Sequence, residues 1–153
     1  MDISIVIPLY NEEDSLSPLT DWIFKSLKNK KYKFEVIFVD DGSNDGSWEV
    51  INKLSNTHSN IRGLRFSRNY GKSQALNAGF VEASGTNIAT LDADLQDSPE
   101  EIPEMISLLD EGYDLISGWK KKRYDSLIFK NLPSKLFNWA ARRVSGIKLH
   151  DFN

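Results

Sequence analysis

Cysteine is absent from this sequence of 153 residues. Its absence excludes a disulfide framework, a thiolate metal site and a cysteine nucleophile, and it fits a reducing compartment. No stretch approaches the roughly 18 uncharged apolar residues that a membrane-spanning helix needs. The chain also does not open with the basic and then apolar pattern of a signal peptide. We therefore expect a cytoplasmic protein.

Glycine and proline are scarce as well. Nine glycines and five prolines are too few for a collagen-like or low-complexity chain. Apolar residues make up 40% of the chain and aromatic residues 11%, which excludes a disordered tail. A chain of this length matches a single domain and can bury a core without disulfides or metals.

Basic residues are few in most of the chain and are concentrated at its end. Residues 1–118 contain 10 Lys and Arg against 20 Asp and Glu, whereas residues 119–153 contain 9 against 2. We interpret residues 1–118 as an acidic α/β part and residues 119–153 as a basic segment of the same domain. Such a segment indicates a surface for phosphates, an anionic membrane or nucleic acid, and it is also compatible with a solvated helix. The acidic body argues against nucleic acid.

The basic segment contains a pattern typical of an amphipathic helix. Pro133 would start this helix, and Leu136, Trp139 and Val144 share one of its faces. Tryptophan and flanking cations suit a membrane interface, but the same face suits packing on the domain equally well.

Short apolar runs alternate with longer helical segments. Four runs have the composition of strands buried on both faces of a sheet, and a weaker fifth follows. The runs cover residues 3–7, 34–39, 61–66, 88–91 and 114–117. Helices are expected over residues 15–29, 47–54, 72–83 and 99–109, the last with Pro99 at its first position. This alternation predicts an α/β fold with a mainly parallel sheet.

A polar cluster follows each predicted strand. The clusters begin at Pro8, Asp40, Ser67, Asp92 and Gly118. Ligands of parallel sheets bind outside the carboxyl ends of the strands. We therefore expect the clusters to meet at one edge and to form a binding site.

Asp92 and Asp94 are the strongest candidates for metal ligands. Residues i and i+2 at the end of an extended strand point to one side, so these carboxylates need a compensating charge. Mg²⁺ or Mn²⁺ would supply it through oxygen ligands and would keep positions open for phosphate oxygens. Gln96 could add a carbonyl ligand. The alternative, two solvated loop carboxylates, is weakened by the apolar strand directly before the pair.

The other clusters each allow two interpretations. Asp40 and Asp41 open a run of turn-forming residues, and they are equally well interpreted as acceptors for a base or ribose. Arg68 and Lys72 lie at the predicted start of a helix, where cations and backbone N–H groups favour an anion. Ordinary surface charge is the alternative for this second pair.

Four motifs together resemble the family 2 inverting glycosyltransferases, which have the GT-A fold. The motifs are residues 6–13 (VIPLYNEE), 39–43 (VDDGS), 68–72 (RNYGK) and 92–100 (DADLQDSPE). Polyprenyl-phosphate sugar transferases of the dolichyl-phosphate mannose synthase kind are the most similar subgroup. The resemblance covers almost the whole chain and implies a Rossmann-like fold of three layers. Because family members typically continue further, it also implies a fold truncated at its C-terminal side.

The resemblance implies a role for each matching residue. Four residues would hold the base and ribose of a nucleoside diphosphate sugar: Pro8, Tyr10, Glu12 and Asp40. Three would hold the divalent cation, and the two carboxylates among them are the catalytic candidates: Asp92, Asp94 and Gln96. Three match positions that bind the acceptor phosphate: Lys120, Arg123 and Lys135. Asp41, Arg68 and Lys72 complete the expected substrate contacts.

The implied activity is metal-dependent, inverting transfer of a sugar to a polyprenyl phosphate at the cytoplasmic face of a membrane. A lipid phosphate is already anionic at neutral pH and needs no general base. One alternative is transfer to a saccharide hydroxyl in polysaccharide synthesis, which would need a carboxylate base. Another is a non-catalytic module that binds nucleotide sugars.

Overall fold

The computed structural model describes residues 1–28 and 32–118. They contain a four-stranded sheet in which all neighbouring strands are parallel. The strands are β1 (Ile3–Leu9), β2 (Phe34–Asp40), β3 (Ile61–Arg65) and β4 (Asn87–Thr90), in the order β3-β2-β1-β4. The direction of winding changes between β1 and β4, and a crevice forms at the carboxyl ends of strands at such a point.

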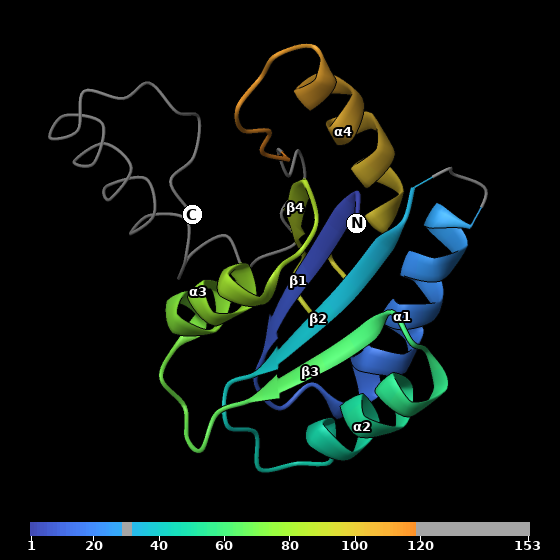
Figure 1. The fold of residues 1–153 in the computed structure, drawn as a ribbon. Helices are drawn as coiled ribbons and strands as arrows, with labels where there is room; N and C mark the ends of the chain where they lie inside the picture. Colours follow the sequence, from blue (N-terminus) through green and yellow to red (C-terminus); the bar gives the residue numbers. More distant parts are fainter. Residues whose placement is uncertain (29–31, 119–153) are drawn as a thin grey trace, which may run out of the picture. The chain divides into compact units, whose positions relative to one another are not determined.

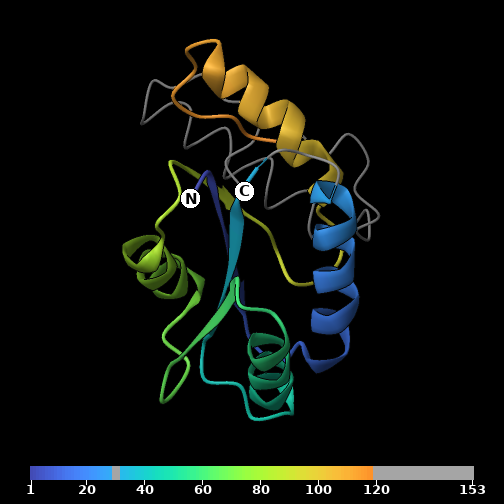
Figure 2. The ribbon, with the colours of Figure 1, turned by 45° about the vertical axis from the view of Figure 1, so that its right-hand side comes forward.

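Helices cover both faces of the sheet (Figure 1, Figure 2). α1 (Glu13–Leu27) and α2 (Ser47–Thr57) lie on one face, and α3 (Lys72–Glu82) lies on the other. A 3₁₀ turn, η1 (Pro99–Glu101), leads into α4 (Ile102–Asp110), which joins the core on the side of α1. These elements belong to one compact unit, Met1–Ile116. The expected three-layer α/β fold is confirmed.

The alternation of side chains along β1 explains why the sheet has a core on each face. Ile3, Ile5 and Ile7 are fully buried on the side of α1 and α2. Val6 points to the other side and packs near Ala75 of α3. Because helices cover both faces, both sides of the strand favour apolar residues, and Ser4 alone interrupts the apolar run of β1.

Gly79 allows α3 to lie close against the central strand. A Cβ at this position would be 2.3 Å from Cγ1 of Val6, closer than two carbon atoms can pack. This contact fixes α3, whose first residue is Lys72, against β1.

The four stronger strand predictions are confirmed, and the fifth is wrong. Residues 114–117 form no strand, and Leu115 is 84% exposed. Within the described residues β4 pairs with β1 alone, and residues 114–117 do not pair with its other edge. No helix in the described part of the chain is long and apolar enough to cross a membrane.

Candidate functional site

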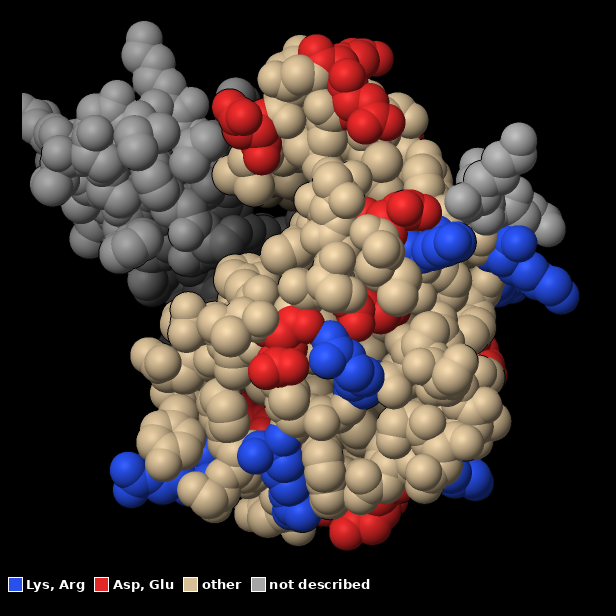
Figure 3. Space-filling view, in the orientation of Figure 1, with Lys and Arg blue, Asp and Glu red and all other residues tan. Residues whose placement is uncertain are grey.

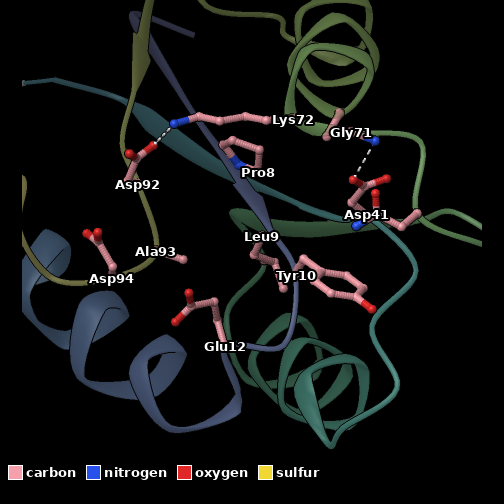
Figure 4. Close-up of a pocket in the computed structure, with 12 residues that line it drawn as sticks. Pro8, Leu9, Tyr10, Glu12, Asp41, Gly71, Lys72, Asp92, Ala93 and Asp94 are labelled. Carbon is pink, nitrogen blue, oxygen red and sulfur yellow. Dashed lines mark hydrogen bonds and ion pairs between the residues drawn. The ribbon is translucent and has the colours of Figure 1, made fainter. Parts of the chain in front are cut away.

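A pocket of about 350 Å³ opens at the carboxyl edge of the sheet (Figure 4). It lies at the ends of β1 and β4, where the winding changes direction. Its lining comes from all four strand ends and the start of α3: Pro8, Leu9, Tyr10, Glu12, Asp41, Asn69, Gly71, Lys72, Ala75, Asp92, Ala93 and Asp94. The first four predicted clusters therefore meet in one place.

The loops after β1 and β2 are joined by reciprocal hydrogen bonds. The Asn11 N–H donates to Oγ of Ser43 at 2.9 Å, and the Glu12 N–H donates to Oγ of Ser47 at 2.9 Å. In return, the Asn44 N–H donates to Oδ1 of Asn11 at 2.9 Å. These bonds fix the loop that carries Tyr10 and Glu12 into the pocket.

Asp45 links the first turns of α1 and α2. Its carboxylate accepts the Glu13 N–H at 3.2 Å and the Ser47 N–H at 3.0 Å. Burial alone would raise the pKa of Asp45, but hydrogen bonds from Ser47 and from the Glu13 N–H outweigh burial and lower the pKa below its usual value. The carboxylate that orders these loops is therefore ionised at neutral pH.

Asp41 holds the loop between β3 and α3. Its side chain is nearly buried, and its two carboxylate oxygens accept the Tyr70 N–H at 2.7 Å and the Gly71 N–H at 2.8 Å. The next residue, Gly42, has a φ of 76°, and a Cβ there would be 2.4 Å from the backbone carbon of Arg68. Asp41 thus fixes the loop before α3, and it also lines the pocket (Figure 4).

Asp40 does not line the pocket. It is fully buried, and Oδ1 accepts the Ser43 N–H at 2.8 Å. Oδ2 lies 3.4 Å from Nε of Arg65 but has no hydrogen-bond partner in the described structure. Asp40 therefore stabilises the turn that leads to Ser43. From the sequence, a role in this turn and a role in ligand binding were equally compatible with Asp40.

Lys72 reaches across the pocket to Asp92 and forms an ion pair with it (Figure 4). Both side chains are partly exposed, with 60% of Lys72 and 38% of Asp92 accessible. Asp94, one residue beyond Ala93, is exposed and accepts the Gln96 N–H at 3.0 Å. Gln96 itself lies outside the pocket lining.

The charges around the pocket are unbalanced. Among the described residues that line it, Lys72 is the one cation beside four carboxylates: Glu12, Asp41, Asp92 and Asp94. The sequence has no Lys or Arg between Lys72 and Lys120. On the face drawn in Figure 3, the region of α4 carries acidic side chains without basic ones among them.

The donor set suits a hard divalent cation bound partly by non-protein ligands. No group of three or more His, Cys, Asp or Glu side chains is arranged to hold a metal within residues 1–28 and 32–118. Asp92 and Asp94 nevertheless offer carboxylate oxygens in the same pocket, and one of them is already neutralised by a cation, Lys72. Mg²⁺ typically binds through one or two carboxylates together with water and phosphate oxygens.

Backbone strain is found next to the pocket residues. Asn11 with a φ of 58° and Leu95 with a φ of 63° are the residues other than glycine that have positive φ in the described chain. Asn11 follows Tyr10, and Leu95 follows Asp94. Such strain is costly and concentrates at functional sites.

The structure brings most, but not all, of the predicted site residues together. Seven of them line the pocket: Pro8, Tyr10, Glu12, Asp41, Lys72, Asp92 and Asp94. Three lie outside its lining: Asp40, Arg68 and Gln96. Arg68 instead lies over the ring of Tyr70, 4.9 Å from its centre. The three basic candidates for the acceptor site lie outside the described residues: Lys120, Arg123 and Lys135.

Sequence reasoning missed part of the lining. Asn69 and Gly71 lie inside the RNYGK motif, and their position after β3 was a sufficient signal. Leu9, Ala75 and Ala93 are small or apolar, and no chemical pattern distinguishes them from core residues.

Solved structures with a similar fold include a mannosyltransferase and a protein in complex with a nucleotide sugar. The mannosyltransferase PcManGT from Pyrobaculum calidifontis, in complex with GDP-Man and Mn²⁺, is 25% identical, with a TM-score of 0.61 over 70% of this chain and 32% of its own. S. aureus TarS 1-349, in complex with UDP-GlcNAc, is 24% identical, with a TM-score of 0.61 over 85% of this chain and 38% of its own. The fold is thus that of the GT-A glycosyltransferases.

The sequence comparison defines the family within this class. The model of glycosyl transferase family 2 matches residues 4–152, and the chain belongs to this family. The resemblance carried by the four motifs is confirmed.

The curated relatives include polyprenyl-phosphate sugar transferases. Undecaprenyl-phosphate 4-deoxy-4-formamido-L-arabinose transferase of Proteus mirabilis (strain HI4320) is 40% identical over 98% of this chain and 46% of its own. Dodecaprenyl-phosphate galacturonate synthase of Rhizobium johnstonii is 37% identical over 99% of this chain and 46% of its own. The chain spans about half the length of these relatives.

Proposed function

We propose that this chain is the donor-binding part of an inverting glycosyltransferase that transfers a sugar from a nucleoside diphosphate sugar to a polyprenyl phosphate. The acceptor class is supported by relatives with 40% and 37% identity whose names specify undecaprenyl and dodecaprenyl phosphate. The donor class is supported by the pocket and by the GDP-Man complex of the Pyrobaculum mannosyltransferase. The observation that carries the proposal is the convergence of Lys72, Asp92 and Asp94 at the switch point of a family 2 fold.

The two sides of the pocket suit the two parts of such a donor. Pro8, Tyr10 and Asp41 would contact the base and ribose, with Asp40 ordering the turn beneath them. Lys72 would bind the diphosphate together with the backbone N–H groups at the start of α3, whose first turn lacks a capping side chain. Glu12 would complete the ribose contacts.

Asp92 and Asp94 would hold Mg²⁺ or Mn²⁺ through their carboxylate oxygens. A bound cation would neutralise the charge that develops on the departing diphosphate. Lys72 would add a second positive charge beside the same phosphates. The backbone N–H of Gln96 would orient the carboxylate of Asp94, and its side-chain carbonyl would offer the cation a further ligand.

The acceptor side is assigned to the basic residues 119–153. Lys120, Arg123 and Lys135 would bind the acceptor phosphate, and the segment would rest on the anionic cytoplasmic face of a membrane. A phosphate monoester has a second pKa of about 6, so it is largely dianionic at neutral pH. Its oxygen would attack the anomeric carbon opposite the diphosphate, which inverts the configuration without a general base.

The test is an acceptor assay with the full-length protein. Undecaprenyl phosphate, undecaprenol and oligosaccharides are each incubated with UDP-, GDP-, CDP- and dTDP-sugars, and the products are identified by mass spectrometry. We expect a lipid-linked sugar monophosphate with undecaprenyl phosphate and none with undecaprenol, which lacks the nucleophile. Transfer to oligosaccharides in the absence of a lipid-phosphate product would contradict the proposed acceptor.

A further inference from the structure

The ion pair between Lys72 and Asp92 occupies a carboxylate that the proposed cation would need. The ammonium of Lys72 contacts Oδ1 of Asp92 directly, and the pair lies in the pocket together with Asp94 (Figure 4). A divalent cation and a lysine ammonium both neutralise a carboxylate, and they repel each other at short range. The two therefore compete for the negative charge of the same carboxylate.

The position of Lys72 is unfavourable for helix stability. It is the first residue of α3, where the helix dipole disfavours a positive charge, and the first turn contains no acidic residue. Stability of the helix therefore does not explain why Lys72 occurs at this position. Its ion pair with Asp92 across the pocket does explain it. The neighbouring backbone is held in place by Asp41, which accepts the N–H groups of Tyr70 and Gly71.

The pair is also able to exchange. Lys72 is 60% accessible and Asp92 38%, so water screens their attraction and either partner is open to replacement. The flexible four-carbon stem of a lysine allows its ammonium to turn without moving the helix. No other lining residue in the described chain carries a positive charge.

We propose that Lys72 is an exchangeable counter-ion, which pairs with Asp92 while the pocket is empty and turns to the donor diphosphate when a divalent cation takes its place. This inference rests on the proposed donor site. Lys72 opposes binding of the cation alone, because the cation must displace it. A nucleoside diphosphate gives the displaced ammonium a new partner, so nucleotide and cation bind cooperatively.

Two opposite changes in affinity test the exchange. Binding of Mn²⁺ without nucleotide is measured from the free Mn²⁺ signal in electron paramagnetic resonance, and binding of UDP and GDP at saturating Mn²⁺ is measured by calorimetry. In Lys72→Met we expect Mn²⁺ alone to bind about fivefold more tightly, the strength of an exposed ion pair. We expect the nucleotide that binds the wild-type protein to bind at least fivefold more weakly.

Two further variants serve as controls. Lys72→Arg keeps a cation that can pair with Asp92, so its Mn²⁺ affinity should stay close to that of the wild type. Lys53→Met removes the same charge from an exposed position of α2 outside the lining, and both affinities should be unchanged.

Each of the other outcomes would refute the proposed exchange, and each would indicate a different role for Lys72 or a failure of the donor site. An unchanged Mn²⁺ affinity in Lys72→Met, with weaker nucleotide binding, would make Lys72 a phosphate ligand only. A parallel loss of both affinities would make its role structural. If the wild-type protein binds neither Mn²⁺ nor a nucleotide, the proposed donor site fails and the exchange fails with it.

Discussion

At the scale of single residues, the pocket combines several carboxylates with one ammonium. Asp92 and Asp94 lie on either side of Ala93, and the only lysine in the described lining pairs with the first of them. Two negative charges in one pocket repel each other, and a cation between them relieves this repulsion. This imbalance is the physical reason to expect a divalent cation at Asp92 and Asp94.

Asp94→Asn is predicted to abolish metal-dependent nucleotide binding. The substitution keeps the size of the side chain and removes the charge that attracts the cation, while the exposed position leaves folding unaffected. Calorimetric titration with UDP and GDP in Mn²⁺ measures the loss. Asp21→Asn, which removes an exposed charge from α1, should bind like the wild type. Binding by Asp94→Asn equal to that of the wild type would refute the metal assignment.

Asp41→Ala is predicted to loosen the loop before α3. It removes two hydrogen bonds to a charged, nearly buried acceptor, and we expect a loss of about 2 kcal/mol in the free energy of unfolding. Hydrogen exchange should accelerate most at the amides of Tyr70 and Gly71. The amide of Phe66, which donates to the Asp40 carbonyl, is the internal reference. Equal acceleration at Phe66 would show a general destabilisation and contradict the local role.

The sequence predicted which strand ends form the site, but not which side each residue faces. Asp40 and Asp41 are adjacent and chemically alike, yet Asp40 ends β2 and is fully buried while Asp41 faces the pocket. Successive residues of extended chain point to opposite sides, so only one of such a pair can reach a given ligand directly. Which one does so depends on the register of the sheet, and that register comes from contacts distant in sequence.

At the scale of elements, the apolar runs located the strands correctly because both faces of the sheet are covered. β1 and β2 are buried along nearly their whole length, and their sequences are apolar except for Ser4, Glu35 and Asp40. The run at residues 114–117 has only two apolar residues between polar ones, and the structure gives it no strand partner. Strand formation depends on such neighbours more than on local preference.

Glu35 links β1, β2 and the end of α3 at the opposite edge of the sheet. Its carboxylate accepts the hydroxyls of Ser4 and Ser84, both at 2.7 Å, and pairs with Arg62 at 2.9 Å. Burial would raise the pKa of Glu35, but these hydrogen bonds, the Ser84 N–H and Arg62 outweigh burial and lower the pKa from 4.5 to about 2.

The lowered pKa predicts a dependence of stability on pH. The contribution of Glu35 is complete above its unfolded pKa of 4.5 and is lost as the pH falls towards about 2. The shift corresponds to about 3 kcal/mol. The free energy of unfolding of the wild-type protein, measured with urea, should therefore fall steeply between pH 4.5 and about 2. Glu35→Gln should be less stable at neutral pH and should lose less on acidification. The same pH profile in Glu35→Gln and in the exposed control Glu49→Gln would contradict this assignment.

At the scale of the whole molecule, the chain joins an acidic α/β body to a basic segment. The body contains the pocket, and residues 119–153 contain the charge that suits an anionic acceptor. Donor and acceptor of the proposed reaction are both phosphates of negative charge, so they need separate cationic partners. In the proposed reaction, Lys72 and a divalent cation would serve the donor, and the basic residues of the final segment would serve the acceptor.

The central claim is that the pocket binds a nucleoside diphosphate with the help of a divalent cation. The most direct measurement is thermal unfolding with UDP, GDP, CDP and dTDP, each in Mn²⁺ and in chelator. A ligand at 100 times its dissociation constant adds about 2.7 kcal/mol to the free energy of unfolding, which raises the melting temperature measurably. We predict stabilisation by one nucleotide in Mn²⁺ that disappears in chelator. No stabilisation by any of the four, or the same stabilisation in chelator, would contradict the account.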